Sequence, residues 1–438
     1  MPESHLKRSL TPAMVWGLGV GYVISGNYFG WNLGLEKGGT LGLAIAIFFI
    51  IILYITFTFS YTELACAIPK SGGAFDYANR AFGKDVGFIT GMAQNIEFIF
   101  APPAIAFAIG SYGNIFFPDV SVLIFSVLAY FIFVALNIWG VKVAATFELV
   151  ITILAVFGLL FFAGLTFPKF QLSHLQQNAF PFGYAGVFAA IPFAIWFFLG
   201  IEGVANLAEE AIDPKRTILI GFGSAIATLV ILCLVTFVSS VGVAGWEAIV
   251  FESDGAISDS PLPLALAQVV DANSLNFRFL LVVGLFGLIA SFHGLMLAAG
   301  RSTYEFGRVG YAPAFVGMVH PEFKTPANAL IVNMGLGILA LLTGKTGEII
   351  TIAVFGALTL YIISMLSLIQ LRRKEPHLVR PFRVPLYPVF PLVALGIASF
   401  SFVAMAIFNL ELAGLYFLII GVSYGIFKVW NSRNSKKQ

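Results

Sequence analysis

Charged side chains are scarce in this sequence. Asp, Glu, Lys and Arg make up 11% of its 438 residues, whereas a soluble globular chain carries roughly 25%. Hydrophobic residues account for 59% and aromatic residues for 15%. This composition excludes an ordinary water-soluble protein and indicates a chain that crosses a lipid bilayer several times. The net charge of +2 gives no indication of nucleic-acid binding.

Cysteine and histidine are too few and too scattered for several kinds of site. The two cysteines, Cys66 and Cys233, lie in or beside apolar runs and lack the spacing of a disulfide framework or a zinc site. The five histidines form no HExxH motif, which argues against a membrane-embedded enzyme such as a lipid-modifying transferase. Neither the rings of like residues typical of a channel nor an appended sensor domain is visible in the sequence. We therefore expect no enzyme, no metal and no cofactor.

Long apolar runs dominate the chain instead. Segments of about 20 predominantly apolar residues are candidate membrane spans. They predict an all-α integral membrane protein with about twelve spans, near residues 13–35, 41–67, 87–116, 120–139, 144–166, 184–208, 217–243, 279–304, 327–343, 347–370, 386–408 and 411–430. The first run is long enough to span, so we expect no cleaved signal peptide.

The basic residues predict the orientation of these spans. Of the 24 Lys and Arg residues, all but Lys37, Lys169, Arg278 and Lys345 fall on the same side as the N-terminus. By the positive-inside rule, both termini then face the cytoplasm. The predicted organisation is a cytoplasmic N-terminus (1–12), a ten-helix core (13–370), a cytoplasmic loop (371–385), two peripheral helices (386–430) and a cytoplasmic tail (431–438).

Two spans contain residues that interrupt helices. The first holds "GLGVGYVISGNYFGWNLG" and the sixth holds "AIPFAIWFFLGIEGVANLAEE". Freed backbone groups survive at membrane depth only where protein or a watery cavity surrounds them. Because the two spans are five apart, they occupy matching positions in two inverted repeats, about 13–166 and 184–370, which is typical of secondary transporters. Close helix packing is the alternative, and we favour it for Gly17 and Gly21. For Ser25, Gly26 and Asn27 we favour a break, because Asn27 adds a polar side chain that packing does not require.

Three separated blocks then resemble one family. They are "YTELACAIPKSGGAFDYANRAFGKDVGFITG", "WFFLGIEGVANLAEEAIDPKR" and "AAGRSTYEFGRVGYAP", and they are similar to the second-to-third, sixth and eighth helix regions of the amino acid, polyamine and organocation transporter superfamily. The resemblance implies ten core helices in two inverted repeats plus two peripheral helices. "GLGVGYVISGNYFGWNLG" with "NIEFIFAPPAIAFAIG" most closely resembles the ethanolamine permease subfamily, which implies uptake of ethanolamine across the bacterial inner membrane.

A small protonated amine needs carboxylates, carbonyl dipoles or aromatic faces in place of its lost water. Glu97 is the sharpest candidate, because it extends a polar stripe on an otherwise apolar span. The resemblance implies an aromatic lid at Trp196, and Asn27 offers a donor and an acceptor to a hydroxyl. A structural role for Glu97 and a core role for Trp196 stay open. The predicted substrate-binding residues are Ser25, Gly26, Asn27, Gln94, Glu97, Trp196, Phe198 and Gly200.

The coupling ion has few candidate carriers. Proton-coupled relatives often place a lysine in the middle of the fifth span, where Ala155 stands here. Our hypothesis is that His293 or Glu202 carries a coupling proton. A neutral buried His293 is the alternative, and Na⁺ also stays open as the coupling ion.

Charged residues near the predicted cytoplasmic ends of the spans suggest a gate. Glu63 and Arg301 are the candidates for an inner gate of opposite charges, with a static charge cluster as the alternative. Glu148, near the inner end of the fifth span, is expected to snorkel toward the interface rather than to function.

The sequence thus predicts a secondary transporter in a lipid bilayer whose partner is a small-molecule amine. An amino acid permease of the same superfamily, acting as a proton symporter or exchanger, is the second interpretation. The chain is expected to act as a monomer or a homodimer.

Overall fold

The computed structural model describes residues 10–70, 72–139 and 144–435. Most of the predicted N-terminal segment (1–12) and the end of the predicted tail (431–438) lie outside the described residues. In the described part the chain is helical, and its β pairing is limited to the isolated bridges Leu10–Ala211 and Phe251–Ile257. The predicted all-α class is therefore confirmed.

The α-helices and the 3-10 helices (η) follow one another along the chain without a named strand. They are α1 (Pro12–Val23), α2 (Ser25–Tyr28), α3 (Asn32–Ala67), α4 (Ala74–Phe82), α5 (Lys84–Phe116), α6 (Val122–Trp139), α7 (Ala144–Thr166), η1 (Phe167–Lys169), α8 (Leu172–Gln176), α9 (Gly183–Ala189), α10 (Ile191–Trp196), η2 (Ile201–Glu210), α11 (Pro214–Ala244), α12 (Glu247–Val250), α13 (Pro261–Ala267), α14 (Leu275–Arg308), η3 (Ala314–Gly317), α15 (Ala327–Leu341), α16 (Thr346–Lys374), α17 (Val389–Phe408) and α18 (Leu410–Ser435).

Nine helices among the described residues are long and apolar enough to cross a membrane. They are α3, α5, α6, α7, α11, α14, α16, α17 and α18. Two shorter apolar helices, α1 and α15, correspond to the predicted first and ninth spans, and α9, α10 and η2 together correspond to the sixth. The count agrees with the twelve predicted spans.

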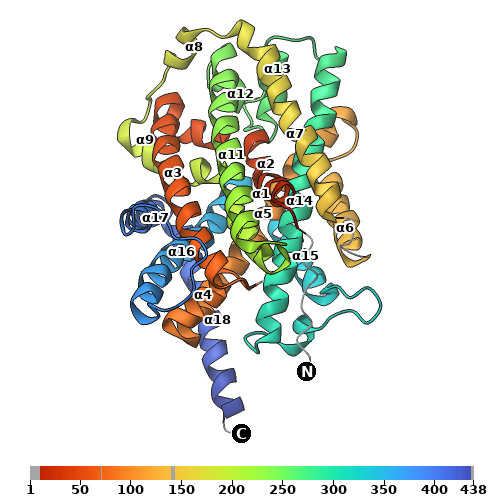
Figure 1. The fold of residues 1–438 in the computed structure, drawn as a ribbon. Coiled ribbons are helices and arrows are strands. Elements are labelled where there is room, and N and C mark those ends of the chain that lie inside the picture. Colours follow the sequence, from red (N-terminus) through yellow and green to blue (C-terminus); the bar gives the residue numbers. More distant parts are fainter. Residues whose placement is uncertain (1–9, 71, 140–143, 436–438) are drawn as a thin grey trace.

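The most buried long helices of the bundle are α5, α14 and α16 (Figure 1). In each of them 78% of the most apolar window is buried, against 33% in α17 and 17% in α18. Helix α5 packs against both α14 and α16. The core helices can therefore hold polar side chains away from lipid, whereas α17 and α18 cover the outside.

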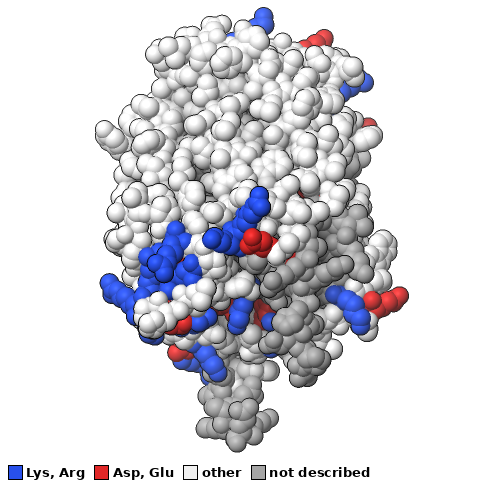
Figure 2. Space-filling model, viewed as in Figure 1, with Lys and Arg blue, Asp and Glu red and all other residues white. Residues whose placement is uncertain are grey.

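Charged side chains are distributed unevenly along the bundle. Figure 2 shows a broad uncharged band around the middle of the visible face and a gathering of Lys and Arg below it. The last helix, α18, ends at that same lower end (Figure 1). An apolar band between charged ends is the surface that a bilayer requires.

The first span is interrupted, but slightly further along the chain than predicted. Ser25, Gly26 and Asn27 form the single helical turn α2. The backbone becomes extended at Phe29 (φ −159°, ψ 172°) and turns at Gly30 (φ +85°) before α3 begins. Glycine takes this positive φ without the strain that a side chain would cause. The predicted break at Ser25–Asn27 is therefore wrong in position, although a break in this span is confirmed.

The sixth span is interrupted where the sequence predicts it. Helix α10 ends at Trp196, a turn follows, and η2 begins after Gly200 at φ +96°. Because Gly200 is left-handed, it redirects the chain between the two halves of the span. Both interruptions place non-helical backbone among buried residues, as a bilayer demands.

Replacing Gly200 tests how strongly the second break depends on this backbone angle. We expect Gly200→Ala to lower the Tm of the purified protein by about 1–4 °C, because a left-handed alanine costs roughly 1–2 kcal/mol. Gly223→Ala is the matched control, since Gly223 is helical and a Cβ there meets no atom within 4 Å. Thermal unfolding followed by tryptophan fluorescence measures both. Equal Tm values for the two variants would contradict the expectation.

Candidate functional site

The two broken spans are in direct contact. The indole Nε1 of Trp196 donates a hydrogen bond to the carbonyl of Phe29 at 3.0 Å, and the two rings meet edge-on at 5.5 Å. A Cβ added to Gly26 would collide with the Trp196 carbonyl oxygen. Gly26 therefore permits a backbone approach that any side chain would prevent. The structure brings Gly26 and Trp196 together, as predicted for one site.

Two buried carboxyl groups lie near each other beside the second break. They belong to Glu97 of α5 and Glu202 of η2, and they interact electrostatically. The Tyr361 hydroxyl of α16 donates to Glu202 Oε2 at 2.9 Å, and it lies 2.9 Å from the Tyr54 hydroxyl of α3. Two neighbouring buried carboxylates repel each other unless a proton or a cation lies between them. Four helical segments thus converge on a place suited to positive charge.

Several polar atoms near the breaks lack hydrogen-bond partners among the described residues. They include both amide atoms of Asn27, both carboxyl oxygens of Glu97, Oε1 of Glu202 and Nε1 of Trp31. An unpaired buried polar group costs about 1–3 kcal/mol and calls for an explanation. A bound polar ligand would satisfy such groups. Their occurrence at the two breaks and on the acid pair is therefore the signature expected of a binding site.

The other predicted substrate-binding residues have partners elsewhere. The Ser25 backbone N–H donates to Ser291 Oγ at 2.9 Å. The Gln94 side chain donates to Ser302 Oγ at 3.2 Å. Phe198 lies against the ring of Tyr54, with 5.0 Å between the ring centroids. Phe198 and Gly200 thus border the acid pair, whereas Ser25 and Gln94 face α14.

Comparison with known proteins identifies the family. The family model described as amino acid permease matches residues 11–424. The chain belongs to this amino acid permease family. Its relatives are transporters, in agreement with the prediction that the protein is no enzyme.

Three relatives show how far this similarity extends. The permease is 28% identical to an uncharacterized transporter of Rhizobium meliloti, over 92% of this chain and 87% of the relative. It is 26% identical to the methylthioribose transporter of Bacillus subtilis, over 90% of this chain and 88% of the relative. It is 24% identical to a branched-chain amino acid permease of the same species, over 99% of this chain and 95% of the relative. These names describe different substrates, so membership of the family leaves the substrate of this permease unassigned.

The predicted gate residues of the permease have separate partners. Glu63 accepts bonds from Arg372 Nε at 2.8 Å and from the Val384 N–H at 2.7 Å, and it lies 3.3 Å from Arg380 Nε. Arg301 instead pairs at 3.0 Å with Glu210, at the end of η2. Glu63 therefore ties α3 to α16 and the segment after it. Arg301 ties α14 to the second half of the broken sixth span.

Glu148 is not a snorkelling residue, and that expectation is wrong. Its side chain is 1% exposed, and its Oε2 lies 3.3 Å from Nδ1 of His293 on α14. The prediction judged Glu148 by its distance from the end of the span, but the face of the helix decides its exposure. Glu148 shares an inward-facing stripe with Ile151, Thr152 and Ala155, all of them buried.

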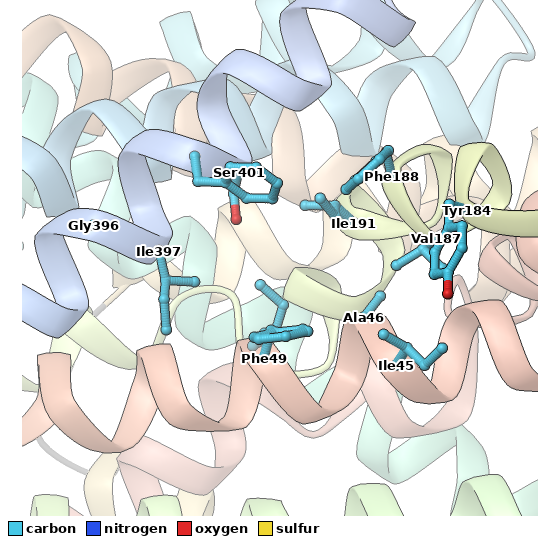
Figure 3. Close-up of a pocket in the computed structure, with 12 residues that line it drawn as sticks. Ile45, Ala46, Phe49, Tyr184, Val187, Phe188, Ile191, Gly396, Ile397 and Ser401 are labelled. Atoms are coloured by element: carbon cyan, nitrogen blue, oxygen red, sulfur yellow. The ribbon is translucent and has the colours of Figure 1, made fainter.

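The permease is closed around its breaks in this conformation. Asn27 and Glu97 are 0% exposed, so no water-sized space reaches them. A cavity of about 440 Å³ lies elsewhere, between α3, α9 and α17, and Figure 3 shows its lining of Ile, Phe, Val and Ala side chains. Such an apolar lining does not suit a charged or zwitterionic substrate. Substrate access to Asn27 and Glu97 therefore requires the helices around the breaks to move.

The end of the bundle opposite the end of α18 carries an acid with a shifted pKa (Figure 1). Asp259, between α12 and α13, accepts a bond from the Thr346 hydroxyl at 3.3 Å. Burial raises the pKa of Asp259 to about 6. The adjoining Ser258 carbonyl accepts a bond at 2.8 Å from Asn32, the first residue of α3. The loop that holds Asp259 thus lies over the end of the first break.

Three functional candidates were missed from the sequence. Tyr54 and Tyr361 complete the acid pair, yet each is one tyrosine within a long apolar run, which gave no signal. Glu148 was noticed but misjudged. The periodicity of the residues that follow it would have placed it on the inward face.

Neutralising Glu63 tests whether its arginine cluster is an anchor. We expect Glu63→Gln to lower the Tm clearly, because removing one partner of a buried ion pair costs about 3 kcal/mol or more. Glu375→Gln is the control, since Glu375 pairs at 2.6 Å with Arg80 but both side chains are about a third exposed or more, and exposed pairs contribute little. Thermal unfolding in one detergent compares them. Equal decreases in Tm for the two variants would show that the buried Glu63 cluster stabilises the fold no more than the exposed Glu375–Arg80 pair does.

The raised pKa of Asp259 predicts a pH-dependent stability. Because the folded state binds this proton more tightly than the unfolded chain, stability falls as pH rises from 3.8 to about 6 and then levels off. Asp259→Asn should therefore raise the Tm by about 1–2 °C near pH 7.5 and leave it unchanged near pH 4. Asp254→Asn, at an exposed position of the same loop, should show no such pH dependence. A pH-independent effect of Asp259→Asn would refute this reading.

Proposed function

We propose that this permease is a secondary active transporter that imports a small organic amine, ethanolamine in particular, by alternating access. The observation that carries the proposal is the pair of buried acids Glu97 and Glu202, which interact electrostatically beside the second break. A cation between them would relieve their repulsion and occupy unpaired oxygens of both.

Aromatic rings around the second break also suit an ammonium group. Trp196, Phe197 and Phe198 immediately precede Gly200, and Tyr54 packs against Phe198. Ring faces attract cations by roughly 0.5–2 kcal/mol when water is excluded. Together with the acid pair they favour an amine over an anionic or purely apolar substrate.

The first break supports a substrate without a carboxylate. Amino acid carriers with this fold are expected to present free N–H groups near Ser25 to a substrate carboxylate. Here the Ser25 N–H is bonded to Ser291 Oγ and the Asn27 N–H to the Ile24 carbonyl. The unpaired amide of Asn27 offers a donor and an acceptor instead, as the hydroxyl of ethanolamine requires.

An amino acid permease is the second candidate function. The observation in its favour is the similarity to the branched-chain amino acid permease of Bacillus subtilis along almost the whole chain. An amino acid would place its ammonium at the acid pair as ethanolamine would. Its carboxylate would then need N–H donors that are occupied in this conformation.

The proposed setting is the bacterial inner membrane with both termini in the cytoplasm. It is supported by bacterial relatives and by the basic residues that gather at the end of the bundle where α18 ends (Figures 1 and 2). The proposed driving ion is the proton, with Glu202 or His293 as its carrier.

Counterflow in proteoliposomes tests the substrate. Vesicles preloaded with unlabelled ethanolamine should accumulate labelled ethanolamine, and excess leucine, serine or glutamate outside should not compete. Because Glu97 supplies the charge that holds the ammonium, Glu97→Gln should abolish both counterflow and the thermal stabilisation that ethanolamine gives the purified protein.

Glu411→Gln is the matched control, since Glu411 is an exposed acid at the start of α18. It should behave as the unmodified protein in both measurements. Competition by an amino acid, with ethanolamine inactive, would replace the proposal with the second candidate. Undiminished ethanolamine affinity in Glu97→Gln would remove Glu97 from the site.

A further inference from the structure

A second buried acid lies apart from the substrate site, at the junction of α1, α7 and α14. Glu148 of α7 has a side chain that is 1% exposed, and its Oε2 lies 3.3 Å from Nδ1 of His293, whose side chain is 10% exposed. The other carboxyl oxygen of Glu148 has no hydrogen-bond partner among the described residues. Ionisable groups at membrane depth are costly and mark functional sites.

This pair touches the helix that leads to the first break. A Cβ built on Gly21 of α1 would lie 2.6 Å from Glu148 Oε1. One turn of α14 contacts both the Glu148–His293 pair and the first break. His293 of this turn contacts Glu148. Ser291 of the same turn donates to the Gly21 carbonyl at 2.6 Å and accepts from the Ser25 N–H at 2.9 Å. A shift of this turn would therefore change the pair and the break together.

The surroundings of the pair leave the proton as its natural ligand. Phe133 of α6 and Phe147 of α7 lie edge-on to His293, and Tyr22 of α1 is the nearest further titratable group on that helix. Beyond Tyr22 lies the Arg301–Glu210 ion pair of α14 and η2. The other helices against α7 are α11, α13 and η1. Among the described residues, their titratable side chains are Cys233, Lys215 and Arg216 of α11 and Lys169 of η1.

We propose that Glu148 and His293 together form the binding site of the coupling proton, a role that rests on the proposed function as a proton-driven transporter. With the proton bound, an imidazolium ion faces a carboxylate and the pair has no net charge. When the proton leaves His293 for water, the imidazole is neutral and Glu148 keeps an uncompensated negative charge. A buried unpaired charge favours separation of the helices and entry of water, which loosens α14 from α1 at the break.

Uptake driven by a pH gradient tests the pair. For one proton per substrate, each pH unit supports about tenfold accumulation. In proteoliposomes that are one unit more acidic outside, the unmodified protein should concentrate labelled ethanolamine about tenfold. Glu148→Gln and His293→Gln should only equilibrate it, while both keep counterflow, which requires no net proton movement. Accumulation at the unmodified level in either variant would overturn the proposal, and so would loss of counterflow in both folded variants.

His174→Gln is the matched control, because His174 is a partly buried histidine bonded to the Gly242 carbonyl on the other side of the bundle. It should accumulate substrate as the unmodified protein does, and protein-free liposomes correct for leakage.

A measurement without substrate separates this proposal from the choice of ethanolamine. The ¹⁵N resonances of selectively labelled histidines, with His293 assigned by its loss in His293→Gln, report whether the His293 ring takes up a proton. The His293 resonances should change in Glu148→Gln, whereas those of His174 should not. A His293 resonance that does not change with pH in the unmodified protein would refute the proposed proton-binding site, even if ethanolamine is transported. If ethanolamine is not transported but His293 titrates as expected, only the substrate assignment fails.

Discussion

Backbone hydrogen bonding in a medium without water is the constraint on which this structure depends. A helix can open at membrane depth only if other protein groups satisfy the carbonyls and N–H groups that it releases. At the first break the Phe29 carbonyl receives a bond from Trp196, and the Gly30 N–H is bonded to the side chain of Asn32. Nearer the start of the span, Ser291 bonds the Gly21 carbonyl and the Ser25 N–H. The first break is thus held by the second break and by α14, and none of the three can move alone.

This constraint explains which parts of the fold the sequence could predict. Apolar runs of sufficient length specify the spans, because composition alone decides whether a segment can lie in lipid. The break at Gly200 was predictable since glycine there is followed by polar residues within a span. The break near Asn27 was placed too early because Ser25, Gly26 and Asn27 all disfavour helix, yet the helical turn continues through Tyr28 before the backbone extends at Phe29 and turns at Gly30. Helix propensity predicts the region in which a break occurs, and tertiary contacts determine the residue at which the helix ends.

The candidate site was less predictable than the fold. Glu97 stood out because charge is rare inside spans, and Trp196 because of the family resemblance. Tyr361 joins the site only through a contact with Glu202 that links residues far apart in the sequence. Glu63 and Arg301 were correctly seen as charges near span ends, yet their partners, Arg372 and Glu210, follow only from how helices pack. A single sequence therefore predicts how deep a residue lies in the membrane far better than it predicts which side chain the residue contacts.

The two acidic centres are connected through one aromatic side chain. The ring of Tyr22 on α1 lies against Gly203, the residue after Glu202, where an added Cβ would be 3.0 Å from the ring. The same ring fits against Gly294, the residue after His293, so closely that a Cβ there would collide with it. Because packed interiors are not continuously deformable, displacement of Tyr22 by a change at one centre must move backbone at the other. If the substrate binds at Glu97 and Glu202 and the coupling proton at Glu148 and His293, as proposed, the two can therefore act on one another through packing, without a continuous chain of hydrogen bonds.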